Sequence, residues 1–396
     1  MAQIVRPTSK RRGHLLRCER EGTGLRPDIA DRRVRDLAAF AGEDSAVRRG
    51  AEDVDVLAQD RDKRRPKESV PIRKAGVEQK IWLWGIRHRY RSCMTARVKV
   101  LFGLGLEAGV HQVSEMLGHA RVADDAGLDI VSVGDHPYFA ERLDAYAALG
   151  FVLGATSNVT AAVIMTNLLS RPAPVLARTV TGLSTISRGR FVLGLGAGGM
   201  WEEIVALGVP RLSPADRVRA LEEAIVVIRA LSGGGDPVTF DGEFYQVTDL
   251  TPAAAPTPPI WIGALGPKTL AVTGRHADGW IPGHLADWRS TLVAESRPVV
   301  DEAAVSAGRD PADVETIYNV SGRLARDPLP ATRDDEGRWI GGGVTQWVEE
   351  LAFAVIERGA AAFIYLVPPG DIISDTTLNL WAHEVVPAVR DAVAKG

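Results

Sequence analysis

The chain has 396 residues, 45% of them hydrophobic, and a formal net charge of −3 at pH 7. This length suffices for one large globular domain or two ordinary ones. No apolar run reaches about 18 residues, and the basic N-terminus lacks the apolar core of a secretory signal, so we expect a cytoplasmic protein without a membrane span.

The charge is divided unevenly along the chain. Residues 1–93 contain 23 Lys and Arg against 14 Asp and Glu, a net of +9, whereas the remainder contains 24 against 36, a net of −12. Both cysteines, Cys18 and Cys93, lie in the first segment. Such a shift indicates a boundary. We predict a disordered or poorly structured basic extension over 1–93, because its apolar residues are too few to offset the entropy of ordering, and a folded domain over 94–396.

A basic extension raises the alternative of a nucleic-acid- or membrane-binding arm. Aromatic residues do not alternate with the basic ones, except in 81–91. We therefore expect neither nucleic acid nor a membrane as a partner.

From Met94 onward, apolar β-rich runs alternate with amphipathic helical patterns. The predicted strands are 98–105, 129–134, 160–166, 190–196, 260–264, 279–283, 314–321 and 361–367. The predicted helices are 111–126, 141–153, 174–187, 214–231, 267–277, 286–307, 344–358 and 376–393. The strands are continuously apolar, as buried parallel strands are, and each needs a helical crossover to reach its neighbour. The pattern predicts an α/β fold, a (β/α)8 TIM barrel, with a doubly wound open sheet as the alternative.

Residues 232–259 interrupt this alternation. The stretch VTFDGEFYQV places Asp241-Gly242 between alternating apolar residues, which is a strong hairpin signal. We predict an inserted hairpin that lies over the barrel mouth.

Candidate site residues follow the strands, because TIM-barrel active sites lie at the C-terminal strand ends. Asp135 and His136 follow the second strand, and an imidazole exchanges protons near neutral pH, although a lone histidine can also be structural. The GLGAGG stretch at 194–199 matches a dinucleotide motif, but no second strand with an acidic end follows, so we interpret it as backbone close to a flat ring or phosphate.

The fifth predicted strand ends in two glycines, and Pro267 then starts a helix. Free backbone N–H groups at a helix N-terminus bind phosphate, and Lys268 adds a charge; a plain tight turn is the alternative. No spacing of histidines or carboxylates indicates a metal site, and no GxSxG motif indicates serine catalysis.

Four segments resemble the luciferase-like monooxygenase superfamily. They are SVGDHPYF (132–139), AVIMTNLLSRPAPVLARTVTGLSTISRGRFVLGLGAG (162–198), VTFDGEFYQV (238–247) and PPIWIGALGPKTLAVTGRHADGWIPG (258–283). The similarity runs in order through 97–390. The stretch IGALGPKTLAVTGRHADGW, together with GDH after the second strand, is most similar to the branch of the family that uses the deazaflavin coenzyme F420.

The resemblance implies a role for each matched residue. Asp135 and His136 would be catalytic and lie beside the cofactor ring. The bulge behind the ring, often with a non-proline cis peptide, would be Ile164, Met165, Thr166 and Asn167. Further cofactor contacts would come from Gly196, Ala197 and Gly198, and the phosphate would bind at Gly263, Ala264, Leu265, Gly266 and Lys268. Tyr138 and Trp201 would be walls for the substrate.

One departure from the family concerns the residue after the GxG turn. The sugar-phosphate dehydrogenases have a proton-donating glutamate there, whereas this chain has Gly199, and its nearest acids are Glu202 and Glu203. We expect an F420-dependent oxidoreductase that transfers a hydride to or from a different small organic substrate. The alternatives are an FMN-dependent monooxygenase fed by a separate reductase, and a non-catalytic cofactor-binding barrel. The resemblance also implies a homodimer.

Overall fold

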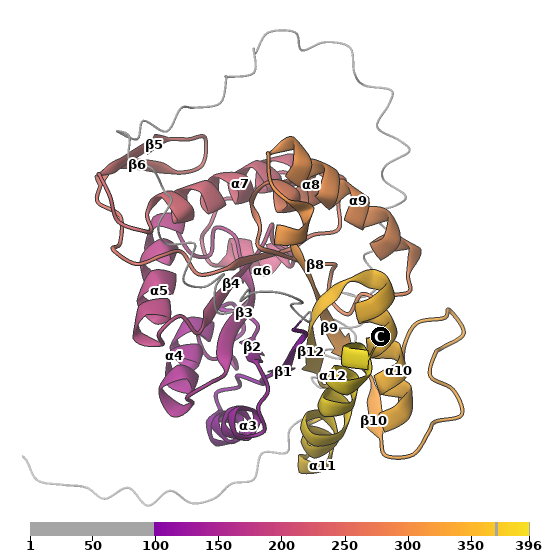
Figure 1. The fold of residues 1–396 in the computed structure, drawn as a ribbon. Helices are drawn as coiled ribbons and strands as arrows, with labels where there is room; N and C mark the ends of the chain where they lie inside the picture. The colour runs from indigo at the N-terminus through magenta and orange to yellow at the C-terminus, as the bar shows by residue number, and fades with distance from the viewer. Residues whose placement is uncertain (1–98, 369–370, 396) are drawn as a thin grey trace, which may run out of the picture. The chain divides into compact units, whose positions relative to one another are not determined.

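We analysed a computed structural model of the chain, which describes residues 99–368 and 371–395. The predictions for residues 1–93 lie outside the described residues. Within the described part, strands form an inner ring and helices surround it (Figure 1). No helix in these ranges combines the length and apolar character needed to cross a bilayer.

The ring is a closed barrel of parallel strands, so the predicted TIM barrel is confirmed for the described residues and the open-sheet alternative is wrong. Its order is β1-β12-β9-β8-β7-β4-β3-β2. The strands are β1 (Leu101–Gly105), β2 (Ile130–Val133), β3 (Thr160–Asn167), β4 (Phe191–Gly196), β7 (Ile260–Gly263), β8 (Gly279–Ile281), β9 (Glu315–Ser321) and β12 (Ala360–Leu366). Each overlaps a predicted apolar run.

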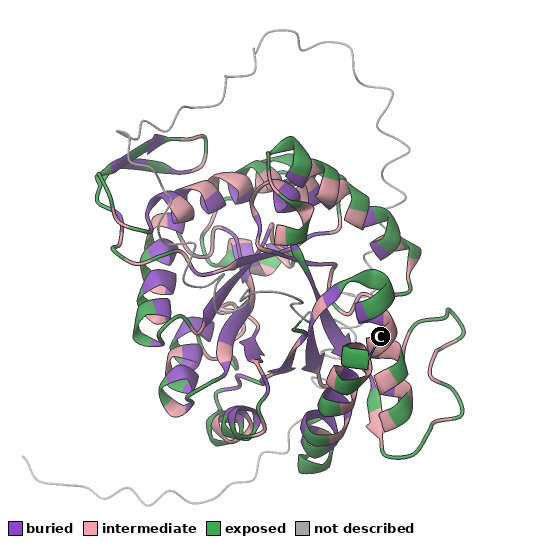
Figure 2. Cartoon of the chain, viewed as in Figure 1, coloured by how far each residue is buried: buried purple, intermediate pink, exposed green. Residues whose placement is uncertain are grey.

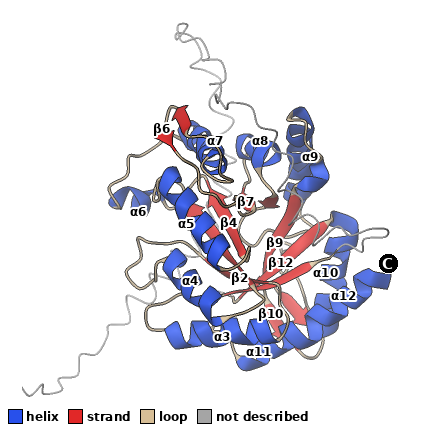
Figure 3. Cartoon of the chain, turned by 60° about the vertical axis from the view of Figure 1, so that its left-hand side comes forward, coloured by secondary structure: helices blue, strands red, loops and turns tan. Residues whose placement is uncertain are grey.

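Helices form the layer outside the strands (Figure 3), and each of the following overlaps a predicted range. They are α3 (Val113–Asp125), α4 (Ala145–Ala155), α5 (Ala173–Ile186), α7 (Pro214–Ala230), α8 (Pro267–His276), α9 (Thr291–Ser306) and α10 (Val344–Arg358). Asp144, Ser213 and Ser290 accept backbone hydrogen bonds at the N-termini of α4, α7 and α9, which fixes where these helices begin. Gly359, at φ 64°, ends α10 in the left-handed conformation that a side chain resists.

Side chains of the barrel strands divide between two apolar cores because successive residues point to opposite faces. The outward side chains pack against the helices in one large cluster. The inward side chains form a second cluster inside the barrel, made of Ile130, Ala162, Val192, Trp261, Ile281, Ile317, Ala362 and Ile364. The barrel strands are accordingly buried along most of their length, while the helices have one buried and one exposed face (Figure 2). The inner cluster closes the barrel, so a site must lie above it at the strand ends.

The inserted hairpin consists of β5 (Val238–Asp241) and β6 (Gln246–Leu250). The prediction of the hairpin is confirmed, but its predicted position over the barrel mouth is wrong. It belongs to the connection from the end of α7 to the start of β7, and it packs alongside α7 (Figure 1). Glu223 of α7 accepts hydrogen bonds from the backbone N–H groups of Glu243, Phe244 and Tyr245 at 2.8–3.2 Å, which holds the turn against this helix.

Four features differ from the predicted elements. A short helix α6 (Trp201–Ala206) follows β4, and β10 (Arg323–Ala325) pairs with β11 (Gly341–Gly343) after β9. The last predicted helix is divided into α11 (Asp375–Asn379), a π-helical turn η2 (Leu380–Val385) and α12 (Val386–Lys395); a 3-10 turn η1 (Pro311–Asp313) precedes β9.

Candidate active site at the barrel mouth

The predicted site residues follow four strands that are neighbours in the barrel, β2, β3, β4 and β7. Asn167 at the end of β3 pairs with Gly196 at the end of β4, which pairs in turn with Gly263 at the end of β7. His136 lies three residues beyond β2. The fold therefore gathers the predicted imidazole, the predicted bulge and the glycine-rich turns on one side of the mouth.

Asp135 is fully buried and forms a two-bond ion pair with Arg171. Arg171 donates from Nε and Nη2 to the two carboxylate oxygens at 2.9 Å each, and from Nη2 to Asp144 at 2.7 Å. Its guanidinium also lies 4.5 Å from the centre of the Tyr146 ring. Burial alone would lower the pKa of Arg171, but its bonds to both aspartates outweigh burial and raise the pKa. Both oxygens of Asp135 are thus engaged, which anchors the loop that carries His136.

The imidazole of His136 is half-buried, and its Nδ1 lies 2.7 Å from the Tyr138 hydroxyl. The same hydroxyl accepts a hydrogen bond from Asn167 Nδ2 at 3.0 Å. Burial, followed by the nearby charge of Arg142, lowers the pKa of His136, and burial raises the pKa of Tyr138 to about 12. At neutral pH His136 is therefore a neutral imidazole beside a protonated phenol. The sequence predicts Tyr138 as a substrate wall; in the structure its hydroxyl bonds to His136 and Asn167.

The segment predicted to support a cofactor ring forms a bulge in β3. The register against β4 shifts between Val163 and Thr166, and the Ile164–Met165 peptide bond is cis. Ile164 and Met165 are half-buried and border the inner core, so their side chains cap it at the mouth. Thr166 is buried and its hydroxyl bonds to the Tyr146 hydroxyl, which ties the bulge to α4.

The glycine-rich turn after β4 has Gly198 at φ 94°. Trp201, 7% exposed, lies beneath this turn, and its indole N–H donates to the Gly198 carbonyl at 3.0 Å. Arg217 stacks on the indole, 4.1 Å from the ring centre. These contacts make Trp201 a support for the backbone at Gly198.

Helix α8 begins at Pro267 directly after the β7 turn, and no side chain caps it. Gly266 and Lys268 are exposed, while Ala264 is buried and Gly263 and Leu265 are half-buried. The first backbone N–H groups of a helix have no partner within the helix and carry its positive dipole end. The turn is therefore suited to hold an anion, and Lys268 stands beside it.

A second histidine, His284, follows β8 at the mouth and was not among the predicted site residues. Desolvation by the surrounding protein lowers its pKa, although the residue is exposed at the surface of the mouth. Its charge also acts to lower the pKa of His136. The only sequence signal for His284 is its place just after the sixth barrel strand.

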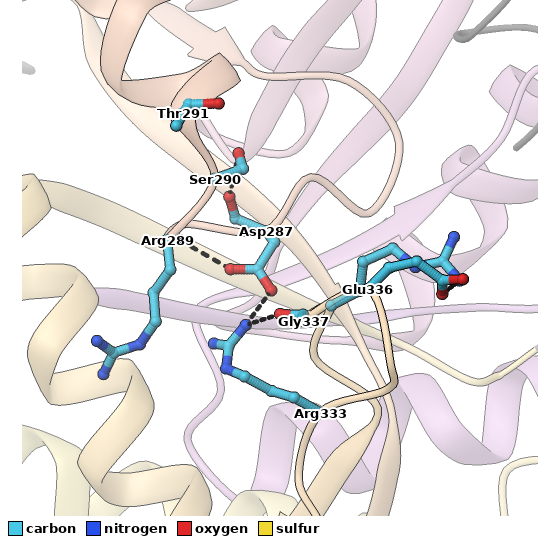
Figure 4. Close-up of a pocket in the computed structure, with 8 residues that line it drawn as sticks. Asp287, Arg289, Ser290, Thr291, Arg333, Glu336 and Gly337 are labelled. Atoms are coloured by element: carbon cyan, nitrogen blue, oxygen red, sulfur yellow. Dashed lines mark hydrogen bonds and ion pairs between the residues drawn. The ribbon is translucent and has the colours of Figure 1, made fainter.

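A pocket of about 310 Å³ lies beyond the ends of β8 and β9, lined by Asp287, Arg289, Ser290, Thr291, Arg333, Glu336, Gly337 and Arg338 (Figure 4). It contains none of the predicted site residues. Arg333 bridges Asp287 and Glu350, and Arg289 also binds Glu350, so these cations are already paired. These ion pairs hold the loop between β10 and β11 against α10 and the segment after β8.

Comparisons with known proteins agree with this architecture. The model of the luciferase-like monooxygenase family matches residues 94–343. An F420-dependent glucose-6-phosphate dehydrogenase of Microbacterium testaceum is 32% identical over 232 residues, 56% of this chain and 68% of that protein. An F420-dependent hydroxymycolic acid dehydrogenase of Mycobacterium tuberculosis is 29% identical over 254 residues, 62% of this chain and 68% of that protein. The chain belongs to the luciferase-like monooxygenase family.

Solved structures share the fold at lower identity. An F420-dependent secondary alcohol dehydrogenase, in complex with an F420-acetone adduct, superposes with a TM-score of 0.64 at 21% identity, covering 74% of this chain and all of that chain. A long-chain alkane monooxygenase gives a TM-score of 0.63 at 12% identity, covering 74% and 91%.

Proposed function

We propose that this protein is an oxidoreductase that transfers a hydride between coenzyme F420 and a small organic substrate. The observation that carries the proposal is the placement of His136, the Ile164–Met165 bulge and the Gly263–Lys268 turn on adjacent strand ends. The relatives named for F420 at about 30% identity support this cofactor over FMN.

The residues at the mouth fit a planar ring with a phosphate-bearing tail. Ile164, Met165, Thr166 and Asn167 would support one ring face, and Gly196, Ala197 and Gly198 would lie along its edge because the glycines there have no side chains. Gly263, Ala264, Leu265, Gly266 and Lys268 would hold the phosphate at the α8 N-terminus. When bound, the deazaflavin supplies the centre that gives or accepts the hydride.

The protein's own contribution is binding, orientation and a positioned proton donor or acceptor. In this proposal His136 is the catalytic residue, and Asp135 acts through the loop that it anchors with Arg171. The turn after GxG contributes no carboxylate, since Gly199 occupies that place. In this proposal His136 therefore donates the proton to the substrate or accepts it from the substrate.

Cofactor titration tests the proposal. Purified protein would be titrated separately with F420 and with FMN, and binding followed by fluorescence. We expect saturable F420 binding with a Kd in the micromolar range or below, and weaker FMN binding. FMN binding without F420 binding would replace the proposal with a flavin monooxygenase, an alternative for which the similarity to the alkane monooxygenase supports only the fold. If the protein binds F420 but His136→Ala leaves its turnover unchanged, His136 does not have the proposed catalytic role.

We also infer a cytoplasmic homodimer in which α4 and α5 form the interface. The outer faces of these helices expose Phe151 (72%), Val175 (62%) and Ile186 (74%). Gly154 and Gly182 are exposed on the same helices, and small residues allow close approach. Apolar side chains this exposed on neighbouring elements favour a protein partner, and a second copy is the simplest one.

The proposed domain spans residues 94–396, and the cofactor site is formed by residues from Asp135 to Lys268. A variant that starts at Met94 should therefore bind F420 with the Kd of the full chain. A loss of affinity would show that the preceding residues contribute to the site.

A further inference from the structure

The Tyr138 hydroxyl lies at the centre of three polar contacts. His136 Nδ1 is 2.7 Å away, Asn167 Nδ2 is 3.0 Å away, and the sulfur of Met200 is 3.6 Å away. Met200 reaches this position from a left-handed backbone conformation, φ 52°, at the start of α6. Four side chains from β2, β3 and β4 or the loops that follow them thus meet at one oxygen atom.

The direction of each hydrogen bond follows from counting protons. Asn167 Nδ2 also lies 3.4 Å from the carbonyl oxygen of Asp135, which can only accept, so this end of the amide is the NH2 group. The Tyr138 oxygen therefore accepts from Asn167. Its single proton can go either to His136 Nδ1 or to the sulfur of Met200, and an imidazole nitrogen at 2.7 Å is the stronger acceptor.

Two arrangements follow from the protonation state of His136. In the neutral imidazole, Nδ1 accepts from Tyr138 and Nε2 carries the proton. In the imidazolium, Nδ1 also carries a proton and donates to the Tyr138 oxygen, so that the Tyr138 hydroxyl turns to the sulfur of Met200. In both arrangements Asn167 donates to Tyr138 and Nε2 remains a donor.

The Nε2 edge of the imidazole lies near the start of the bulge proposed to carry the cofactor. A Cβ atom built on Gly134 would lie 3.1 Å from Nε2 of His136 and 3.7 Å from the Ile164 carbonyl oxygen. The Cδ2–Nε2 edge of the imidazole therefore lies at Gly134, and the Ile164 carbonyl oxygen, at the start of the bulge, lies near the same point. The opposite edge, Nδ1, faces Tyr138.

We propose that Tyr138 is a positioning residue that, with Asn167 and Met200, holds His136 in one orientation in both protonation states and keeps its Nε2–H directed toward the bulge. This inference rests on the proposed function. It requires a substrate whose reacting carbon atom bears an oxygen atom, as in an alcohol or a carbonyl compound. Imidazolium Nε2–H gives its proton to the substrate oxygen, so that an N–H bond breaks and an O–H bond forms. The imidazole left behind carries its proton on Nδ1 and donates it to Tyr138; proton exchange with solvent then returns it to the resting tautomer, in which Nε2 carries the proton and Nδ1 accepts from Tyr138. Oxidation of an alcohol would reverse this transfer.

The charges around His136 limit which other group could bond to its Nδ1 atom. Besides burial, Arg142 and His284 lower the pKa of His136, whereas Asp135 and Glu107 raise it. Since Asp135 is held by Arg171 and Glu107 pairs with Arg142, no carboxylate bonds to Nδ1 in the described residues. Tyr138 is therefore the group that decides which nitrogen carries the proton.

Nitrogen-15 NMR of histidine-labelled protein tests the proposal without needing a substrate. The His136 signals are assigned by their loss in His136→Gln. In the wild type at neutral pH, we expect protonated Nε2 and unprotonated Nδ1. In Tyr138→Phe, we expect a mixture of both tautomers. Tyr146→Phe is the matched control, since it removes another buried tyrosine hydroxyl, bonded to Thr166, and should leave the His136 signals unchanged.

Met200→Leu separates the two arrangements. It removes the acceptor that Tyr138 uses only when His136 is charged, so the apparent pKa of His136 should fall while its neutral tautomer stays as in the wild type. An unchanged tautomer in Tyr138→Phe, or a wild-type that carries its proton on Nδ1, would overturn the proposal. F420 titration of the same samples keeps the two proposals distinct: absent F420 binding counts against the proposed function, whereas the NMR result decides the role of Tyr138.

Discussion

Met165 lies directly against Gly263: a methyl group built on Gly263 would come within 2.1 Å of both Sδ and Cε of the Met165 side chain. The bulge of β3 and the end of β7 are thus in contact across the end of β4, which lies between them in the barrel. Because Met165 is proposed to support the cofactor ring, the absence of a side chain at Gly263 determines where that support lies.

Gly263→Ala should weaken F420 binding more than it destabilises the fold. The end of a methionine side chain moves at small energetic cost, so we expect a loss of less than about 1 kcal/mol in unfolding free energy. The displaced sulfur would enter the space proposed for the ring, and we expect Kd to rise roughly tenfold, equivalent to about 1.4 kcal/mol. Fluorescence titration and thermal unfolding measure the two effects.

Gly118→Ala is the matched control for this substitution. Gly118 lies in α3, and apart from its chain neighbours and the backbone of its own helix no atom lies within 4 Å of an added methyl group, so the change should leave F420 affinity unaltered and stabilise the helix slightly. Equal F420 affinity in Gly263→Ala and the wild type would contradict the proposed position of the ring. Recovery of affinity in Gly263→Ala combined with Met165→Ala would support it.

Arg171→Leu should destabilise the fold strongly. The substitution leaves the fully buried carboxylate of Asp135 without its cation, and breaking a buried pair in this way costs about 3–5 kcal/mol. Urea unfolding measures the loss. Combining it with Asp135→Asn removes the unpaired charge and should restore part of the stability; a double variant no more stable than Arg171→Leu would show that the pair is not what stabilises this loop.

Glu222 should make the fold sensitive to acid. Its hydrogen bond to His276, and then its bonds and charge pairing with Arg275, lower its pKa from the ordinary 4.5 to about 2. A carboxylate with a lowered folded-state pKa stabilises the fold above pH 4.5, and this contribution disappears as the pH falls from 4.5 to 2. Because the side chain is one-third exposed, we expect about 1–2 kcal/mol rather than the full shift.

Unfolding at a series of pH values compares Glu222→Gln with the wild type. The variant should be less stable at pH 7, and the difference should vanish near pH 2. A difference independent of pH would mean that the carboxylate charge does not contribute.

Phe151→Glu should convert the proposed dimer to a monomer, because a charge would be buried without a partner at the α4–α5 interface. Analytical ultracentrifugation measures the mass. Ile356→Glu is the matched control, since Ile356 is also exposed (54%) but lies on α10. A wild-type monomer, or a Phe151→Glu dimer, would contradict the proposed interface.

The barrel could be predicted from the sequence because its strands are uninterrupted apolar runs and its helices follow regular periods. The pairing of β10 with β11 could not, since Gly341–Gly343 has no apolar pattern and the paired segments are far apart in sequence. The hairpin was recognisable from Asp241-Gly242, but its place beside α7 depends on hydrogen bonds to Glu223, which no local pattern encodes.

In the candidate site, too, the positions of the strand ends could be predicted from the sequence, whereas the contacts of single side chains could not. The ends of β2, β3, β4 and β7 had to lie together once the barrel was inferred, so His136 and the glycine turns could be grouped from the sequence. The partners of individual side chains could not: Arg171 bonding to Asp135, and Asn167 bonding to Tyr138, depend on rotamers and on distances between strands. These contacts add supporting roles for Tyr138 and Trp201, and their predicted role as substrate walls stays a prediction.

Asn319→Leu should stabilise the fold while lowering activity. Asn319 is 5% exposed and lies two residues after Ile317 of the inner core, so its side chain points into the barrel, where its Oδ1 has no hydrogen-bond partner among the described residues. Replacing a buried, unsatisfied amide with an apolar side chain of similar size should gain about 1 kcal/mol, measured by urea unfolding. Asn319→Asp, which introduces a charge at the same place, should lose stability.

A polar group left unsatisfied in this way is expected where a ligand uses it, because the cost to stability is then offset by binding. Asn319 lies on β9, which is opposite β3 and its bulge in the barrel order, and we expect the substrate to bind on this side of the mouth. Turnover of F420 by Asn319→Leu should fall although the protein is more stable. A variant that is less stable than the wild type would show instead that Oδ1 has a partner in solution, such as a bound water molecule, and serves the fold.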